Sequence, residues 1–318
     1  MTKETSNSFK GVLAIVVMTE HILQYAGFRN LFSECPKFVQ SVIGSVMEQL
    51  GVVSVACFFM LSGYGLRVSV DYGGVAYARS MFRRKIIPFY GIVLISAIMY
   101  FLMFVAIGSP KSVYEFLHSF GFGGTIIVNG WFLQVILVIY LLFASIYSLG
   151  IRCLQGGGAV IIVLIIEVCC IGAGLSRTWY QTLPTFALGF YWNDVATTKA
   201  NNPYALLMVA FMLFVIRELL PCQYGSLNIV ILQVYIVCIA SAVFDVANMF
   251  SFKNAVVGFL GGLFLEIYIC HGLFLKIYSS RLPISNGVLY GMAVFASTII
   301  LALAIRPLFR LILNCCQK

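Results

Sequence analysis

The sequence predicts an all-α fold, a polytopic membrane helix bundle of about ten transmembrane helices. Of its 318 residues, 61% are hydrophobic and only 10% are charged, and the mean hydropathy is +1.00. A soluble domain is about 45–50% apolar and about 25% charged. Because no long polar stretch, low-complexity tail or linker interrupts this composition, residues 1–318 are predicted to form a single integral-membrane domain.

Apolar windows of about 20 residues, bounded by charged residues, Gly, Pro or Asn, define the predicted spans. They cover residues 9–27, 46–66, 86–107, 126–149, 158–175, 179–193, 203–220, 227–246, 255–277 and 287–309. The sixth window is short and contains Pro184 and Gly189. Proline breaks the hydrogen-bond ladder of a helix, so this segment is predicted to be broken or to cross only partly.

The placement of Lys and Arg predicts the orientation of the bundle. With a cytoplasmic N-terminus, ten spans place thirteen of the 20 Lys and Arg residues on the inner side and seven on the outer side. Cytoplasmic loops carry such an excess. Both termini are therefore predicted to be cytoplasmic, with the chain in the cell (inner) membrane among its lipids. This topology also explains the net charge of +9. Nucleic-acid binding is not expected, because no basic domain exists to hold a duplex.

The first predicted span carries two ionisable residues at its ends, in FKGVLAIVVMTEHILQY. Lys10 and His21 are separated by about three helical turns, so both are expected on one face, roughly 16 Å apart along the axis. An ionisable group at membrane depth is costly and marks a candidate functional site. Glu20 precedes His21, but adjacent helical residues diverge, so a direct pair is not expected. The alternative is a histidine satisfied by a neighbouring helix.

A basic cluster follows the second predicted span, in ARSMFRRKIIPFY. Two interpretations are open. The cluster anchors the cytoplasmic side against anionic lipid headgroups, or it clamps the phosphates of a soluble anionic cofactor, since Arg makes forked contacts to phosphate. The cations are Arg79, Arg83, Arg84 and Lys85, just before Pro88.

Further polar residues fall within predicted spans, and so many of them in one domain indicate an aqueous cavity. They are Glu48, Glu167, Asp245, Glu266 and His271. Glu266 and His271 are five residues apart on one predicted helix, so their side chains are expected to diverge. His118 is expected to be solvated in an outer loop. The 10 cysteines lack metal-ligand spacing, and no metal site is predicted.

Five segments, in this order, carry a family resemblance. A basic residue and a histidine frame the first span, here Lys10 and His21; ACFFMLSGYGL contains Ser62 and Tyr64; RRKIIPFY precedes the third span; NGWFLQVILVIY contains Trp131; and FLEIYICHGL lies in the ninth. Together they resemble the membrane-bound acyltransferase-3 family of the O-acetyltransferase type. The chain departs from the family in having Lys10 where arginine is usual, which keeps the charge but loses the forked geometry. The register of the basic cluster is also shifted.

The resemblance implies an acetyl-CoA-dependent O-acetyltransferase. Such an enzyme moves an acyl group from cytosolic acyl-CoA to a hydroxyl of a cell-surface or lipid-linked carbohydrate. It implies His21 as the general base, because neutral imidazole is suited to removing a hydroxyl proton. The further catalytic candidates are Lys10, Glu20, Glu266 and His271. The candidates for binding acetyl-CoA are Arg79, Arg83, Arg84, Lys85, Ser62 and Tyr64.

Several alternatives stay open at the level of sequence. A proton-coupled secondary transporter or flippase of a glycan or small anion would also place carboxylates and histidines within the membrane. Transporters often carry helix interruptions in matching halves, and here only the sixth window is interrupted. A non-catalytic family member that binds a lipid-linked glycan is a third reading. For the enzyme, direct transfer and an acyl-histidine intermediate on His21 both fit. The acceptor, the acyl group and the oligomeric state are not predicted.

Overall fold

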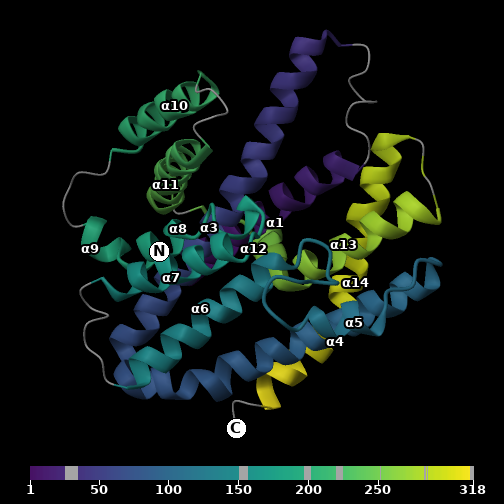
Figure 1. Ribbon diagram of the computed structural model, residues 1–318, viewed down its shortest axis with the longest axis horizontal. Coiled ribbons are helices and arrows are strands. Elements are labelled where there is room, and N and C mark those ends of the chain that lie inside the picture. The colour runs from purple at the N-terminus through teal and green to yellow at the C-terminus, as the bar shows by residue number, and fades with distance from the viewer. Residues whose placement is uncertain are drawn as a thin grey trace. The chain divides into compact units, whose positions relative to one another are not determined.

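The computed structural model is all-α (Figure 1), which confirms the predicted fold class. It describes residues 1–25, 35–149, 157–196, 202–219, 225–250, 252–282, 284 and 286–315. Four cations used to predict the orientation lie outside the described residues: Arg29, Arg152, Lys199 and Lys318.

A helix accompanies each predicted span. The longer helices are α1 (Lys3–Tyr25), α3 (Lys37–Met81), α4 (Ile87–Ala106), α6 (Trp131–Ser148), α7 (Gly158–Gly172), α10 (Pro203–Leu219), α11 (Gly225–Met249), α13 (Phe264–Ser280) and α14 (Gly287–Cys315). The shorter elements are η1 (Phe82–Ile86), α5 (Val113–His118), η3 (Arg177–Trp179), α8 (Pro184–Phe190), α9 (Trp192–Ala196) and α12 (Ala255–Gly261).

Among the described residues, 4 helical segments are long and apolar enough to cross a membrane, and the bent pair of α12 and α13 makes a fifth if it counts as one span. The four are Lys37–Ala106, Trp131–Ser148, Leu227–Met249 and Gly287–Asn314. The shorter apolar helices α7 and α10 fall below this length, and the sixth predicted span is broken into η3 and α8, as its proline indicated. The chain is a multi-pass membrane protein.

The second and third predicted spans are joined by helix rather than by a loop. Within α3, Gly74 has φ 54° and ψ −146°, a conformation open to glycine because it lacks a Cβ. The π-helical turn η1 then leads into α4, with the Ile87 N–H donating to the Phe82 carbonyl. Pro88 follows at once; it has no N–H, and its ring would crowd the carbonyl four residues back. A widened turn at this point accommodates the proline.

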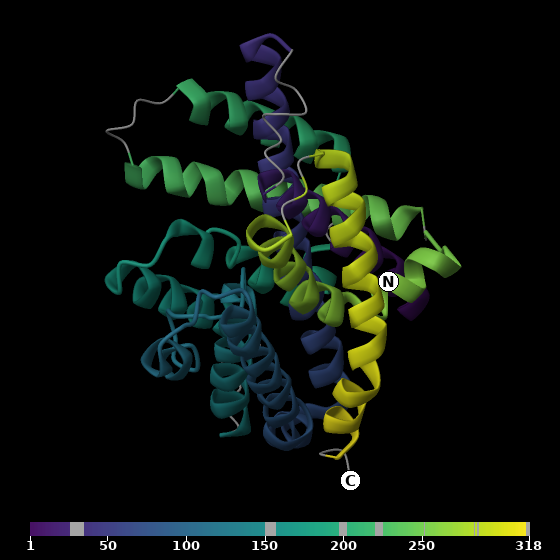
Figure 2. The ribbon, with the colours of Figure 1, turned by 90° about the vertical axis from the view of Figure 1, so that its right-hand side faces the viewer.

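The chain divides into two compact units. The first comprises Met1–Phe9, Val52–Arg79 and Ile139–Gly258, and the second comprises Lys10–Gly51, Ser80–Val138 and Phe259–Lys318. In the first unit, α10 and α11 lie side by side (Figures 1 and 2). Two glycines bring α3 and α8 together, because a Cβ on Gly63 would lie 2.1 Å from the Phe186 carbonyl oxygen and one on Gly189 would lie 2.1 Å from that of Met60. Small residues allow such approach between membrane helices.

In the second unit, α13 packs against α14 and α4. Tyr100 of α4 is fully buried and donates from its hydroxyl to the Ile269 carbonyl of α13, 2.8 Å away. At Gly272 an added Cβ would lie 2.3 Å from the same Tyr100 hydroxyl and 2.9 Å from Cβ of Val128. The absence of a side chain at Gly272 therefore lets the segment before α6 approach α13, next to His271.

Candidate active site

Side chains from three parts of the second unit meet at His21. His21 lies on α1, and its Nδ1 is 2.8 Å from Nε2 of His271 on α13 and 3.2 Å from Nδ2 of Asn129, which precedes α6. The two imidazole rings are nearly coplanar and meet edge to edge through this contact, with centroids 5.0 Å apart and planes 6° apart. His271 is only 1% exposed, whereas the His21 side chain is 15% exposed. Of the two, His21 is the ring that a substrate can reach.

The hydrogen-bond partners assign the tautomers of both histidines. His271 Nδ1 lies 3.2 Å from the Ile267 carbonyl oxygen, which can only accept, so Nδ1 carries the proton. Nε2 of His271 is then an acceptor, and Nδ1 of His21 donates to it. The neutral His21 ring with this tautomer has its lone pair on Nε2, which can take a proton and then donate to Glu20 Oε2, 3.3 Å away.

Glu20 approaches His21 from the other side of the ring. Its Oε2 lies 3.3 Å from His21 Nε2, while its Oε1 accepts from the Gln24 side-chain amide. Gly51 of α3 leaves room, because a Cβ there would lie 2.8 Å from Glu20 Cδ. The expectation that these neighbours would stay apart is wrong, because the long Glu side chain bends back toward the imidazole. A carboxylate here pairs with the imidazolium that forms when Nε2 is protonated.

Lys10 lies on the same helix as His21, as predicted, with its Nζ 5.5 Å from the centroid of the Phe264 ring. The charge of Lys85 acts on it, so α1 and the basic turn η1 share one charged region. Arg83 and Arg84 are exposed in η1 and Lys85 is half-buried. These cations belong to the second unit together with His21.

Three other predicted cofactor-binding residues belong to the first unit. Arg79 is exposed and donates from Nε to the Ser148 carbonyl, 3.4 Å away. The Tyr64 hydroxyl lies 3.2 Å from the N-terminal ammonium of Met1, and its ring packs edge-on against Phe244. Ser62 is half-buried on α3. The structure thus places Arg83, Arg84 and Lys85 in the same unit as Lys10, and it describes Arg79, Ser62 and Tyr64 in a separate unit.

Glu266 and His271 diverge on α13, as their spacing predicted. Glu266 is 8% exposed, and the charges of Arg306 and Arg310 on α14 act on it. Arg306 also lies 5.6 Å from the Phe259 ring centroid. Glu266 therefore balances cations of α14, while His271 turns to α1.

Asn129 is the site residue that the sequence did not single out. It lies two residues before Trp131, which drew attention instead, and its contact with His21 spans 108 residues of chain. The Asn-Gly dipeptide was the available signal, since it marks a turn. The signal gave no indication of a partner on the first helix.

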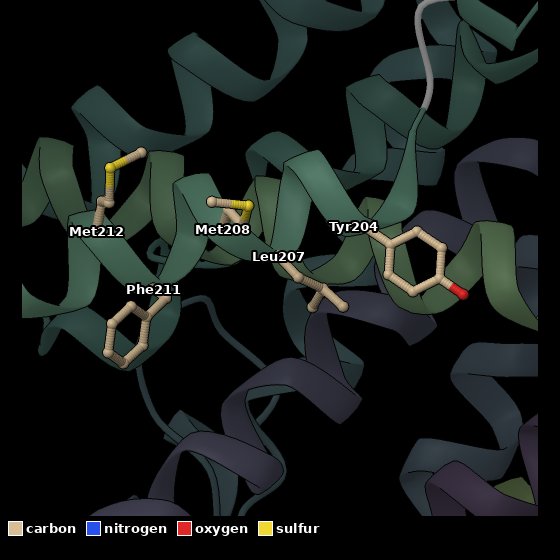
Figure 3. A pocket seen from close by; sticks show the side chains of 5 residues that line it. All are labelled: Tyr204, Leu207, Met208, Phe211 and Met212. Atoms are coloured by element: carbon tan, nitrogen blue, oxygen red, sulfur yellow. The ribbon is translucent and has the colours of Figure 1, made fainter.

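Other polar and hollow places are formed by other residues. In the first unit, Gln233 donates to Glu167, 2.9 Å away, and a polar cavity of about 350 Å³ includes the ion pair of Lys253 with Glu4, 2.9 Å apart. His118 is exposed, as expected. One face of α10 forms a shallow concavity of about 480 Å³, and Figure 3 shows its side chains directed away from the helix. Its lining is apolar apart from one hydroxyl and consists of Tyr204, Leu207, Met208, Phe211 and Met212.

Comparison with protein families identifies the family of this chain. The acyltransferase domain of the acyltransferase-3 family matches residues 6–306. The chain belongs to the acyltransferase-3 family. The match covers α1, the basic turn, Asn129 and α13, and together with the apolar helices it makes this protein a membrane acyltransferase. It favours the enzyme over the transporter and flippase alternatives. The comparisons with curated proteins and with solved structures return no match.

Proposed function

We propose that this acyltransferase is an acetyl-CoA-dependent O-acetyltransferase. It moves the acetyl group from cytosolic acetyl-CoA to a hydroxyl of a cell-surface or lipid-linked carbohydrate. The observation that carries the proposal is the surroundings of His21. Its Nδ1 is engaged by a buried histidine, its Nε2 faces Glu20 at 3.3 Å, and its side chain keeps 15% exposure. Those are the requirements of a general base held in one orientation.

The acceptor half of the reaction needs proton removal, because a sugar hydroxyl is a poor nucleophile at neutral pH. His21 Nε2 takes that proton, and the Glu20 carboxylate stabilises the resulting imidazolium. His271 acts as a positioning residue, holding the proton on His21 Nδ1 in the way that a third group orients the base of a catalytic triad.

The donor half needs cations for the phosphates of the cofactor. Arg83, Arg84 and Lys85 lie on one widened turn, and the charge of Lys85 reaches Lys10. The guanidinium groups suit phosphate oxygens because each presents a fork of N–H donors. Lys10 lies on the same helix as His21 and within reach of the charge of Lys85, so it is placed to attract the donor toward the base.

The test is transfer of labelled acetyl from acetyl-CoA by the purified protein supplied with membrane glycolipid acceptor. His21→Ala should lower turnover by at least roughly 10²–10⁴-fold, the usual loss of a general base, while coenzyme A still binds. His21→Gln should fare little better, because an amide cannot take the proton. The matched control is His118→Ala, which removes an exposed histidine and should leave turnover unchanged. Near-normal turnover in His21→Ala would reject His21 as the base.

The acceptor is identified by mass spectrometry of surface glycans from cells with and without the protein. We expect glycans from the deficient cells to lack the mass of one acetyl group on a sugar hydroxyl. Unchanged glycans, from cells in which the protein is active toward acetyl-CoA, would contradict a carbohydrate acceptor.

A further inference from the structure

Asn129 has a backbone conformation that a side chain rarely adopts. Its φ is 59°, and it is the one non-glycine residue with a positive φ in the described part of the chain. Asn tolerates this left-handed region better than most residues. Such a conformation is kept where the surrounding structure determines it, and it is concentrated at functional sites.

Several contacts hold Asn129 in this conformation. The Tyr268 hydroxyl of α13 donates to its backbone carbonyl. Asn129 lies in the segment between α5 and α6. Gln134 of α6 holds the start of this segment, because its side-chain amide donates to the Ser119 carbonyl, 2.8 Å away. Within the segment, the Thr125 hydroxyl donates to the Ile127 carbonyl, 3.1 Å away. The two neighbours of Asn129 complete the fit, because Val128 packs at the open face of Gly272 and Gly130 has no room for a Cβ.

The side-chain amide of Asn129 faces the base. Its Nδ2 is 3.2 Å from His21 Nδ1. That nitrogen carries a hydrogen, because it donates to His271 Nε2 and His271 donates in turn to Ile267. A nitrogen that carries a hydrogen in the ring plane has no lone pair to accept from Asn129. The side-chain N–H groups of Asn129 are therefore held beside His21 without donating a hydrogen bond to its ring.

We propose that Asn129 is a catalytic residue that donates a hydrogen bond to the carbonyl oxygen of the acyl group as it becomes an oxyanion. This inference rests on the proposed function. The acceptor oxygen bonds to the thioester carbon, its proton passes to His21 Nε2, and the carbonyl π pair moves to oxygen, where Asn129 stabilises it. The intermediate then collapses, the carbon–sulfur bond breaks, and the coenzyme A thiolate leaves with that electron pair and takes the proton from His21. A fixed donor aimed at such an oxyanion contributes strongly in a site that excludes water.

A merely orienting role for Asn129 makes the opposite prediction for one variant. If the amide were turned so that its oxygen accepted from His21 Nδ1–H, Asn129→Asp would keep that acceptor and strengthen it with a charge. Turnover would then be kept or raised. A donor to the oxyanion is lost in Asn129→Asp, because a carboxylate has no N–H and repels the developing charge. The size and the tolerance of a positive φ are the same in both residues.

The experiment compares Asn129→Asp and Asn129→Gly with the unaltered protein in the labelled acetyl-CoA assay. Glycine removes the side chain but accepts the φ of 59° without strain. Both variants should lower kcat by roughly 10²–10³-fold, as loss of one oxyanion donor does. Coenzyme A, titrated calorimetrically, should bind each of them within about threefold of the unaltered protein. The control is Asn286→Asp, which should leave turnover unchanged, because Asp also accepts from the backbone N–H groups at the start of α14.

The outcomes separate the two proposals. Undiminished kcat in either Asn129 variant, while His21→Ala is inactive, overturns the oxyanion assignment and leaves the general base in place. A rise in KM with kcat unchanged also overturns the oxyanion assignment, since Asn129 would then bind the donor substrate and the transition state equally. Normal turnover in His21→Ala overturns the proposed function itself. Loss of activity in His21→Ala and in both Asn129 variants, while each variant still binds coenzyme A, supports both the proposed function and the oxyanion assignment.

Discussion

His21 owes its chemistry to residues far along the chain. The helix that carries it supplies Glu20, whose other carboxylate oxygen accepts from Gln24. The partner of Nδ1, His271, lies 250 residues away and is almost fully buried. A buried ring with both nitrogens engaged has one orientation, so it imposes that orientation on the more exposed ring. At the scale of the residue, the proposed base has the position of its proton set by a neighbouring histidine.

His271 provides the first prediction. His271→Leu keeps much of the volume but cannot accept from His21 Nδ1, so the proton is free to move to Nε2 and the base is lost. We expect kcat to fall at least about 100-fold, within the range for loss of proton-transfer catalysis, with the KM for acetyl-CoA little changed. In His271→Gln the amide oxygen can still accept, and kcat should recover by about tenfold or more. Equal loss in both variants would assign His271 to packing alone.

The next prediction concerns how the stability of α5 depends on pH. This helix lies outside the membrane spans and contains Glu115. A hydrogen bond from Lys111 and another from the Ser112 backbone N–H lower the pKa of this carboxyl from 4.5 to about 2. Because its pKa is depressed in the folded protein, its contribution to α5 is fully present above about pH 4.5 and is lost as the pH falls toward 2. Ser112 and Glu115 form a capping box at the start of this helix, which ties the charge to the helix end.

The measurement is hydrogen exchange of the α5 amides, followed by mass spectrometry and corrected for the intrinsic rate at each pH. Protection should be constant from pH 7 to about pH 5 and should decline below about pH 4.5. In Glu115→Gln the protection should be lower at pH 7 and should show no such decline. A constant protection in the unaltered protein down to pH 2.5 would contradict a stabilising charge at this helix end.

At the scale of the element, a proline shapes the basic turn. Pro88 follows η1, where the widened ladder sets Arg83, Arg84 and Lys85 in consecutive positions of a π turn. Isolated π turns are rare and are frequent at functional sites. A different cause applies to the ninth predicted span, which bends by 74° between α12 and α13, where consecutive glycines stand in place of helix-forming residues. Both irregularities lie in helices that bear candidate site residues.

Arg83 and Arg84 provide the prediction at this scale. Changing both to Ala should weaken coenzyme A binding at least about tenfold. Added salt should erode the remaining affinity, because exposed charges are screened over roughly 8–10 Å. The measurement is calorimetric titration of coenzyme A at low and high salt, with Lys3→Ala as a control that removes a different exposed cation. Unchanged affinity in a well-folded double variant would make the cluster a topology anchor.

At the scale of the whole molecule, the distribution of Lys and Arg predicts which side of the membrane each loop faces. Single cysteines at Tyr72 and Tyr114 test it in a background without other cysteines, since these positions are 91% and 74% exposed. Residue 72 should react with a membrane-impermeant thiol reagent only from the cytosol, and residue 114 only from outside. Labelling of both from one side would show that the span predicted at 86–107 does not separate them.

Much of the architecture and part of the site could be predicted from the sequence. Composition sets the membrane class, because so few charges cannot surround a soluble core. The helical repeat places Lys10 and His21 on one helix and turns Glu266 away from His271. The proline in the sixth window predicts that the helix of this segment is broken. Each of these follows from properties of neighbouring residues, and local geometry suffices to derive them.

Only the tertiary structure determined which residues contact His21. Asn129, His271, and the glycines that admit Glu20 and Val128 come from segments that meet only in the folded second unit. Local periodicity carries no information about which distant helices pack together, because packing depends on shape along their whole length. The sequence by itself determined a membrane acyltransferase with a histidine in its first helix. Folding determined which nitrogen of that histidine keeps its lone pair, because only the fold brings a second imidazole and a backbone carbonyl into line with it.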